Sequence, residues 1–413
     1  MKYGINHTDV NFNREGDVNF KEELLRLQKV DWAFAESDTQ YLTHNYHPYP
    51  ARFIPQIPSK LIQCLSEAGE WVFDPFCGAG TTLVESTLLG RNCIGNDLNP
   101  IGALVSKVKS NLVSVEDKPE LENLMADIEG YFEQATDTLS LIPNLSVIPE
   151  YNLPDIPNRD HWFTPTVQEE LGILLARINM VVSQFLADFC RVAFSAILVG
   201  VSNQGGETYY GRKEKTIPPG TVYKRFVSKL REMWTRMEGY REDRQPVTSQ
   251  VINNDLRTLE DFPPDLRVQL VITSPPYPNA FDYFLYHRHR MFWLGYDPIA
   301  MSKKEIGSHL NYQRKGTTEQ NIAAFKESMR LCFQRINSVL ETYRFCCLVI
   351  GDSVFKQQLV ENDQLIIEIA RDCGFKLEVN LERDIHAYRR SFTSAARRAK
   401  SEHIVILRKV EDV

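Results

Sequence analysis

The sequence predicts an α/β fold with a mostly parallel sheet covered by helices on both faces. Short apolar runs of strand length alternate with helix-like segments in two parts of the chain, residues 36–112 and 250–413. The last two strands follow each other without an obvious helix, which indicates an antiparallel hairpin at one edge of the sheet. Between the two parts, residues 113–249 carry helical periodicity alone and predict a helical insertion.

Length and composition are those of an ordinary globular protein. The 413 residues allow a large core, with 43% hydrophobic and 24% charged residues. No apolar run approaches the roughly 18 residues of a membrane span, and the polar start is unlike a signal peptide, so we expect a cytoplasmic protein. The formal charge of -7 argues against a protein that coats nucleic acid indiscriminately, but a local basic groove stays possible. The eight cysteines show no C-x-x-C spacing and predict buried thiols without a metal.

The first part of the chain predicts a strand, a glycine turn, a helix, a second strand and an acid, in that order. Residues 1–35 form an N-terminal extension, and the proline-rich stretch 41–55 is expected to run extended along a site before a helix at 56–66. A strand at 71–76 leads into the turn 77–82 and a helix that Gly90 ends. A second strand, 92–95, ends at Asp97, and Asn99-Pro100 opens another helix.

The insertion and the later strands complete the expected elements. Helical segments are expected at 166 to about 199 and at 222–241, separated by a polar loop of glycines, tyrosines and basic residues, 201–219. Strands return at 250–253, 268–273, 345–350, about 376–381 and 403–408.

The glycine turn between Asp74 and Thr82 could bind a ligand. Gly78 and Gly80 let the backbone pass close to a bound group, and the next helix offers unpaired N–H groups at its start. Asp97 lies 17 residues beyond Gly80, near the roughly 20 expected for an acid that binds ribose hydroxyls. With two of the three fingerprint glycines, the turn disfavours a dinucleotide, and a tight turn without a ligand is the alternative.

The second candidate site is Thr273-Ser274-Pro275-Pro276-Tyr277, which ends an apolar strand. Neither proline can donate a backbone hydrogen bond, and both stiffen the turn. A rigid carbonyl, a small hydroxyl and an aromatic ring at the end of a strand suit a flat, amino-bearing ring.

Together, Asp74-Pro-Phe-Cys-Gly-Ala-Gly-Thr-Thr82 and Thr273-Ser-Pro-Pro-Tyr277 resemble the S-adenosylmethionine-dependent DNA amino-methyltransferases that modify cytosine N4 or adenine N6. The resemblance implies a Rossmann-like methyltransferase fold with a seven-stranded sheet. It also implies S-adenosylmethionine as cofactor and double-stranded DNA as partner. The serine in S-P-P-Y looks more like the N4-cytosine members, since N6-adenine members usually carry aspartate. Adenine N6 is the alternative.

The resemblance also assigns roles to individual residues. The Ser274 hydroxyl and the Pro275 carbonyl would hold the target amino group, with Pro276 stiffening the loop and Tyr277 stacking on a flipped base. Phe53 and Pro55 could instead brace the first helix, and Asp97 and Asp255 could be helix caps. The residues implied in cofactor binding are Phe53, Pro55, Asp74, Phe76, Cys77, Gly78, Gly80, Thr81, Asp97, Leu98 and Asp255.

The sequence departs from the commonly described members of the family in one respect. The long insertion falls between the second and third strands, before Asp255, so the resemblance covers it poorly. We expect residues 113–249 to serve as a target-recognition region.

The stretch from Tyr283 to Arg290 could wall the base pocket or be a core helix.

Two basic segments are candidates for contact with DNA. The candidate DNA-binding residues are Arg212, Lys213 and Lys215 in the insertion loop, and Arg389, Arg390, Arg397, Arg398 and Lys400 between the last two strands.

The expected function is a DNA methyltransferase of a restriction-modification or related defence system, with a cognate endonuclease as a possible partner. An amino-methyltransferase for RNA or protein glutamine is an alternative, because P-P-Y loops also serve those substrates. A catalytically silent nucleic-acid-binding module is a third.

Overall fold

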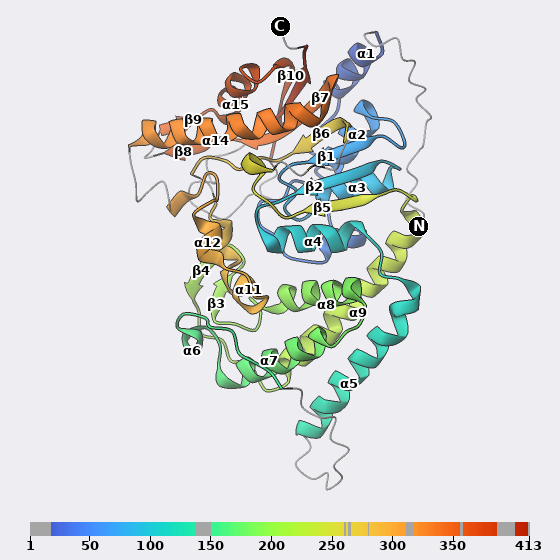
Figure 1. Cartoon of the computed structure of the whole chain (residues 1–413), viewed down its shortest axis with the longest axis vertical. Helices are drawn as coiled ribbons and strands as arrows, with labels where there is room; N and C mark the ends of the chain where they lie inside the picture. Colours follow the sequence, from blue (N-terminus) through green and yellow to red (C-terminus); the bar gives the residue numbers. More distant parts are fainter. Residues whose placement is uncertain are drawn as a thin grey trace.

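The computed structural model describes residues 18–136, 150–259, 262, 266–279, 281–310, 317–355, 358–385 and 401–411. Within these ranges the chain forms a seven-stranded sheet and two separate two-stranded hairpins (Figure 1). The seven strands are β1 (Trp71–Asp74), β2 (Asn92–Asn96), β5 (Ser249–Ile252), β6 (Val268–Thr273), β7 (Leu340–Gly351), β10 (Phe375–Asp384) and β11 (Ser401–Lys409).

The sheet has the order β10-β11-β7-β6-β1-β2-β5. Five neighbouring strands, from β7 to β5, pair in parallel, whereas β11 runs antiparallel to both β7 and β10. The predicted Rossmann-like α/β fold is therefore confirmed, and its reversed strand is the last one, inserted beside the edge strand. The chain order changes direction at β1, whose neighbours are β2 and β6, and ligands of open α/β sheets bind at such a switch point.

Helices cover both faces of the sheet because side chains of the buried strands alternate between them. Phe73 faces α14 (Thr318–Val339) and α15 (Asn362–Arg371), while Val72 faces α1 (Val18–Leu27), α2 (Gln56–Leu65) and α3 (Thr81–Leu88). Both side chains are fully buried, as are most residues of β6 and β7.

The insertion is mostly helical, as predicted, but its details differ. The segment expected at 166–199 is two helices, because the chain turns between Asn179 and Gln184. The loop 201–219 contains a short antiparallel hairpin, β3 (Gln204–Gly206) and β4 (Tyr209–Arg212), too short and glycine-rich to give a strand signal. The helices are α5 (Lys118–Thr136), α6 (Arg159–Trp162), α7 (Pro165–Asn179), α8 (Gln184–Ile197) and α9 (Thr221–Asp243).

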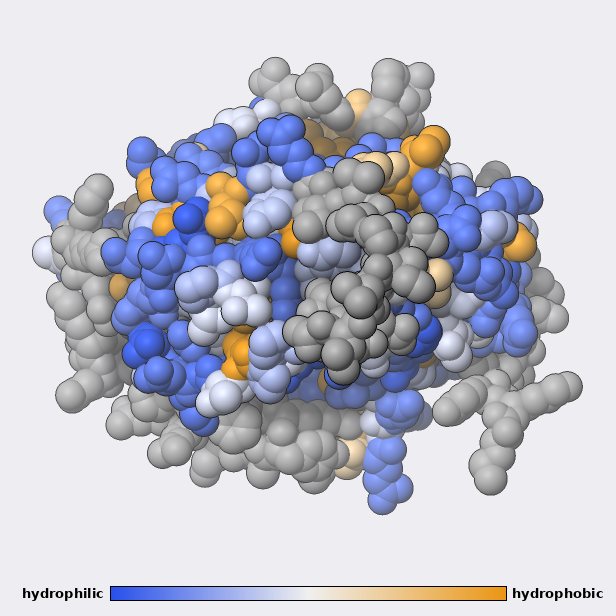
Figure 2. Space-filling model, turned by 90° about the horizontal axis from the view of Figure 1, so that it is seen from below, coloured by the Kyte–Doolittle hydropathy of each residue, from blue (hydrophilic) through white to orange (hydrophobic). Residues whose placement is uncertain are grey.

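The insertion shares one hydrophobic core with the edge of the sheet domain. Its helices bury apolar side chains against Ile101 and Val105 of α4 (Pro100–Ser110) and against Met291 and Trp293 of α11 (Arg288–Trp293). The same end of the molecule is mostly hydrophilic on the outside, with small scattered apolar areas (Figure 2).

The remaining elements connect these layers. None of the helices in the described ranges is long and apolar enough to cross a membrane. All eight cysteines are buried and free, as predicted. The further elements are η1 (Leu42–Asn45), η2 (Val115–Asp117), η3 (Leu256–Thr258), α10 (Tyr283–Tyr286), α12 (Pro298–Ser302), β8 (Ser353–Phe355) and β9 (Gln358–Val360), of which the β8–β9 hairpin was not predicted.

Candidate functional site

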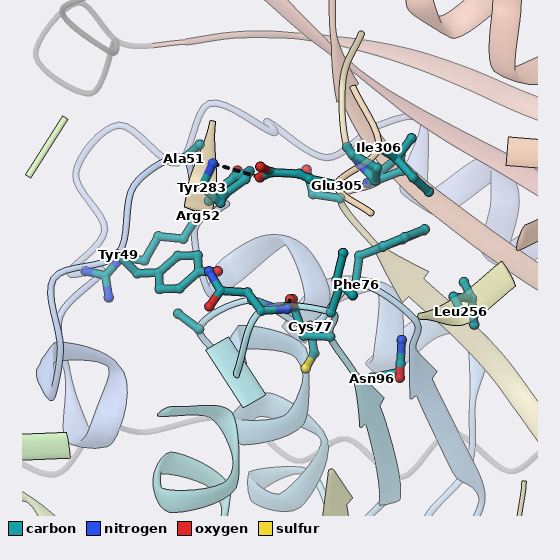
Figure 3. A pocket seen from close by; sticks show the side chains of 18 of the residues that line it. Tyr49, Ala51, Arg52, Phe76, Cys77, Asn96, Leu256, Tyr283, Glu305 and Ile306 are labelled. Carbon is teal, nitrogen blue, oxygen red and sulfur yellow. Dashed lines mark hydrogen bonds between the residues drawn. The ribbon is translucent and has the colours of Figure 1, made fainter. Parts of the chain in front are cut away.

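A pocket opens at the carboxyl ends of β1, β2 and β6, at the switch point of the sheet (Figure 3). It holds about 910 Å³ of space, including its opening to solvent. Both predicted motifs meet in it, since its lining includes Cys77 and Gly78 after β1 and Ser274, Pro275 and Pro276 after β6.

The glycine turn is held in place by α4. Gly80 has φ +73°, and a Cβ there would lie 2.8 Å from the Ser106 Cα, so the close approach of turn and helix requires glycine. The Ser106 hydroxyl donates to the Gly78 carbonyl at 2.7 Å, and the buried Lys109 ammonium donates to the Ala79 carbonyl at 2.6 Å. Burial lowers the pKa of Lys109 well below its usual value. With these carbonyls turned toward α4, the turn presents its other side to the pocket.

Asp97, at the end of β2, joins the turn to the next helix. Its carboxylate accepts a hydrogen bond from the Gly78 N–H at 2.7 Å and from the Asn99 N–H at 2.7 Å. Burial raises its pKa to about 6, and the two N–H donors oppose that rise. Asp97 lines the pocket and is placed to accept hydrogen bonds from ligand hydroxyl groups.

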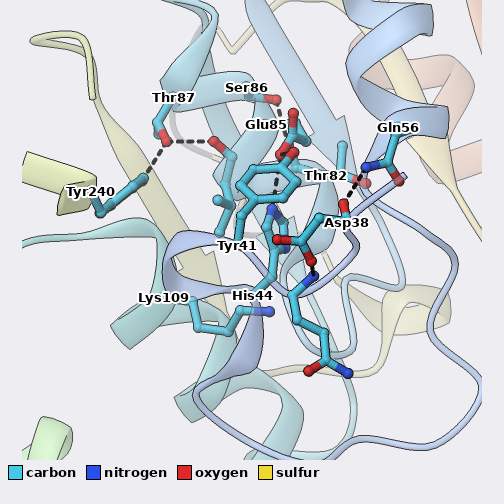
Figure 4. A network of polar contacts seen from close by, with 12 residues as sticks. Asp38, Tyr41, His44, Gln56, Thr82, Glu85, Ser86, Thr87, Lys109 and Tyr240 are labelled. Atoms are coloured by element: carbon cyan, nitrogen blue, oxygen red, sulfur yellow. Dashed lines mark hydrogen bonds and ion pairs between the residues drawn. The ribbon is translucent and has the colours of Figure 1, made fainter. Parts of the chain in front are cut away.

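The proline-rich stretch 41–55 forms one wall of the pocket and is anchored to α3 by polar contacts (Figure 4). The buried Glu85 carboxylate accepts from the Tyr41 hydroxyl at 2.5 Å and faces His44 Nε2 at 2.8 Å. Burial lowers the pKa of His44 to about 4, so a neutral ring donates its Nε2–H to Glu85. The Arg52 guanidinium donates to the His44 carbonyl. The anchored stretch places Tyr49 and Arg52 at the pocket.

The Ser274 loop separates this pocket from a smaller one. The second pocket, of about 320 Å³, is lined by the loop and by the aromatic side chains of Tyr277, Phe281 and Tyr283. The Tyr277 hydroxyl donates to the Val349 carbonyl at 3.2 Å and lies 3.3 Å from the Ser274 hydroxyl. Because tyrosine has one hydroxyl proton and a carbonyl can only accept, Ser274 must donate to Tyr277. The lone pairs of Ser274 are then free to accept a hydrogen bond.

Glu305 brings a carboxyl group into the larger pocket opposite the glycine turn. It accepts hydrogen bonds from the N–H groups of Tyr283 at 2.7 Å and Phe284 at 3.4 Å. Burial raises its pKa to about 8, with the charges of Asp282 and Asp97 adding to the effect. No lysine or arginine in the described part of the chain forms an ion pair with it. The pocket thus contains a carboxyl group that has no positively charged partner among the described residues.

Most of the predicted cofactor residues line the larger pocket. Asp255 does so while paired with Arg257 at 2.6 Å and capping η3. The others on the lining are Phe53, Phe76, Cys77, Gly78, Thr81, Asp97 and Leu98.

Pro55, Asp74 and Gly80 are not on the lining. Pro55 precedes α2 as its N-cap residue. Asp74 is buried under the turn, where it accepts from the Phe76 N–H at 3.2 Å, and burial raises its pKa to about 7. These residues shape the wall, and Gly80 does so through its packing on α4.

The predicted DNA-binding residues are only partly described by the structure. Arg389, Arg390, Arg397, Arg398 and Lys400 lie outside the described residues. Arg212 and Lys213 are exposed on the β3–β4 hairpin, whereas Lys215 donates to the Val199 carbonyl at 2.7 Å, and burial lowers its pKa.

The stretch from Tyr283 to Arg290 serves both of the roles considered for it. Tyr283 lines both pockets and stacks on Tyr49, with ring centroids 5.9 Å apart. His287, His289 and Arg290 are buried in the core instead.

The remaining lining residues were not predicted from the sequence. They come from chain segments without a motif and reach the pocket through tertiary contacts. They include Asn96, Asn254, Leu256, Met301, Lys304, Glu305 and Ile306.

Comparison with known proteins agrees with the two motifs. Residues 11–101 match the N6/N4 methyltransferase family model, described as DNA methylase. The chain is 28% identical over 305 residues to the type II methyltransferase M.MvaI of Kocuria varians, an alignment that covers 70% of this chain and 65% of that protein. Over residues 11–101 this chain is thus similar to DNA methylases of the N6/N4 family. This similarity supports S-adenosylmethionine as the cofactor.

A second relative covers the chain to a similar extent. The type II methyltransferase M.MjaII of Methanocaldococcus jannaschii is 20% identical, with 72% of each protein aligned. The chain thus spans slightly less than two thirds of M.MvaI and somewhat more of M.MjaII.

Among solved structures, a TehB-like S-adenosylmethionine-dependent methyltransferase from Corynebacterium glutamicum aligns over 94% of this chain and 97% of its own. Its sequence identity is 9% and its TM-score is 0.31. At this TM-score we base the fold on strand order alone.

Proposed function

We propose that this chain is a DNA amino-methyltransferase that transfers a methyl group from S-adenosylmethionine to cytosine N4 of a flipped base. The observation that carries the proposal is the position of Ser274. Its hydroxyl lies on the wall shared by the two pockets, with its proton directed to Tyr277 and its lone pairs open. An open acceptor between a cofactor pocket and an aromatic pocket fits an amino group that is to be methylated.

The larger pocket fits the cofactor in size and in chemistry. Asp97 is placed to accept from ribose hydroxyls, and the apolar side chains of Phe76 and Leu256 suit an adenine ring. Arg52 and Glu305 offer opposite charges for the carboxylate and ammonium groups of the methionine part. When bound there, S-adenosylmethionine supplies an electrophilic methyl group.

The smaller pocket would receive the base. Flipping the target nucleotide out of a duplex costs a few kcal/mol, which stacking against Tyr277, Phe281 or Tyr283 would offset. Hydrogen bonds from the amino group to Ser274 and to the Pro275 carbonyl would orient its lone pair away from the loop. Most of the rate gain would come from this positioning.

The choice of cytosine rests on Ser274 in place of the aspartate that N6-adenine members usually carry. The related type II methyltransferases support a place in a restriction-modification system, with a cognate endonuclease as partner. The insertion, which shares a core with α11 beside the pocket, would read the target sequence.

Long-read modification mapping and nucleoside mass spectrometry test the proposal. We expect DNA from cells expressing the chain to carry N4-methylcytosine in one sequence motif, and the Ser274→Ala variant to lose it. N6-methyladenine without N4-methylcytosine would contradict the choice of cytosine. Tritium transfer to tRNA but not to DNA would contradict the whole assignment, and cofactor binding without transfer to any DNA would indicate a silent module.

A further inference from the structure

The β3–β4 hairpin carries a tyrosine whose setting is unusual. The side chain of Tyr209 is 62% exposed, although its ring lies against the backbone of its own hairpin. A Cβ at Gly211 would lie 2.2 Å from the ring atom Cζ, and one at Gly205 would lie 2.4 Å from Cδ1. The ring therefore packs flat against two glycines, because the Cβ of any other residue at these positions would clash with it.

The hairpin is fixed to the core behind the catalytic loop. Glu207, in its turn, forms two hydrogen bonds of 2.9 and 2.8 Å with the buried guanidinium of Arg290 on α11. On the inner face the Tyr210 ring stacks on His289, with centroids 5.3 Å apart and planes at 23°. Since side chains of a strand alternate, Tyr209 points outward from this anchored hairpin.

The hairpin also lies close to the base pocket. Its strand β4 packs against α10, the short helix that contributes Tyr283 to both pockets. Both strands of the hairpin lie beside α11 and α12 in Figure 1. Tyr209 is thus carried by an element one helix away from the pocket that receives the base.

The charges around Tyr209 favour nucleic acid as its partner. Arg212 at the end of β4 and Lys213 directly after it are exposed, with Arg212 also donating to the His161 carbonyl at 3.2 Å and lying 3.8 Å from the Glu214 carboxylate. The other large apolar side chains with high exposure in the described part of the insertion lie elsewhere: Met180 and Val182 between α7 and α8, and Val115 on η2. A single exposed ring among cations is a poor protein-binding patch but matches the aromatic platforms that stack on bases.

We propose that Tyr209 is a stacking platform for a nucleobase of the bound DNA near the flipped target. Gly205 and Gly211 leave room for its ring to lie flat on the hairpin backbone. This inference rests on the proposed function, because it requires DNA as the substrate. It adds an aromatic contact, outside the catalytic loop, that positions DNA without using a charge.

The test measures binding of a fluorescein-labelled duplex that contains the motif methylated by the wild-type enzyme, by anisotropy, in the presence of S-adenosylhomocysteine. Loss of one base–aromatic stack weakens binding by about fivefold or more, so we expect this for Tyr209→Ala and Tyr209→Leu and a change below twofold for Tyr209→Phe. Leucine can cover the glycines but cannot stack. Wild-type affinity in Tyr209→Leu would overturn the inference, because the ring would then serve only to cover the hairpin backbone.

The salt dependence separates stacking from phosphate contact. Each phosphate contact contributes a slope of about 0.9 in log Kd against log salt. We expect Tyr209→Ala to keep the wild-type slope and Lys213→Ala to reduce it by about 1; a reduced slope in Tyr209→Ala would contradict stacking. Tyr343→Ala, a matched control for an exposed tyrosine at the start of β7, far from the carboxyl ends of the strands, should bind as the wild type does.

The failure of this inference can be told apart from the failure of the proposed function. If the wild-type enzyme methylates no DNA, the proposed function is wrong. If it methylates DNA while Tyr209→Ala and Tyr209→Leu bind the duplex as tightly as the wild type, the platform alone is wrong. Unchanged melting temperatures and cofactor affinity in these variants confirm that the hairpin change is local.

Discussion

Replacing Glu305 by glutamine should remove a pH dependence from cofactor binding. The Glu305 carboxyl lines the larger pocket, proposed to bind the cofactor, without a cationic partner among the described residues, and burial raises its pKa to about 8. S-adenosylmethionine carries a sulfonium and an ammonium group, both of which favour the ionised carboxylate. Binding should therefore release a proton from Glu305, and affinity should rise with pH up to the pKa of the free enzyme.

The magnitude follows from the fraction of Glu305 that is ionised before binding. With a pKa of about 8, about 3% is ionised at pH 6.5 and about 24% at pH 7.5. The affinity should then increase at most about eightfold across this interval. Asp97 and Asp74, with pKa values of about 6 and about 7, also titrate near this range, but both remain in the variant and cancel in the comparison.

Isothermal titration calorimetry of the wild type and of Glu305→Gln between pH 6.5 and pH 7.5 measures the effect. Glutamine can still accept from the Tyr283 N–H, so the loop should keep its fold, which thermal melting checks. Titrations in buffers of different ionisation enthalpy count the released proton directly. S-adenosylhomocysteine, which lacks the sulfonium charge, shows which cationic group Glu305 faces. Equal pH slopes in the wild type and in Glu305→Gln would refute the reasoning.

Three other substitutions probe the motifs. Ser274→Ala should lower kcat by about 10- to 100-fold, the equivalent of one hydrogen bond to a group that gains charge, while the cofactor Kd measured by calorimetry stays the same. Tyr277→Phe keeps the ring but removes the oxygen to which the Ser274 hydroxyl donates, so the Ser274 proton can point toward the target amino group and weaken that hydrogen bond. The kcat should therefore fall less than in Ser274→Ala. The DNA affinity should be retained in anisotropy titrations. Gly80→Ala puts a Cβ 2.8 Å from the Ser106 Cα at φ +73°, and the left-handed backbone alone costs about 1–2 kcal/mol. Its melting temperature should fall and its cofactor Kd should rise; a wild-type melting curve would show that α4 gives way.

The strands of the parallel sheet and the two motifs could be predicted because their signals are local. The apolar runs at Val72 and Val271 have strand length, and each ends in a turn that only glycine or proline explains. Carboxyl ends of neighbouring parallel strands meet at one edge, so the glycine turn and the Ser274 loop were bound to share a site once β1 and β6 paired. The residues at those turns needed no tertiary information.

Other residues could not be placed from sequence because their partners are distant in the chain. Arg290 looks like a surface cation beside His289, yet it is buried since Glu207, 83 positions earlier, pairs with it. Lys215 looks like a phosphate ligand, but its ammonium donates to the Val199 carbonyl. Glu305 follows a short helix without any motif and enters the pocket only because the chain folds back on Tyr283. The charged residues of the sequence therefore did not reveal which of them are exposed and free to bind DNA.

Ser195 of α8 contacts two segments of the chain that flank the larger pocket. Its hydroxyl lies 2.8 Å from Nε2 of the buried His47, in the stretch that carries Tyr49, and its carbonyl accepts from Arg290 Nε at 2.9 Å, beyond the catalytic loop. The ring of His287 stacks on Tyr49 between them, with centroids 4.8 Å apart. The helix that packs in the insertion core thus holds two pocket walls that are more than two hundred residues apart in sequence. Ser195, His47 and Arg290 are all buried, so a shift of α8 would disturb these contacts. If the insertion binds DNA and this pocket binds the cofactor, as proposed, these contacts would couple the two binding events.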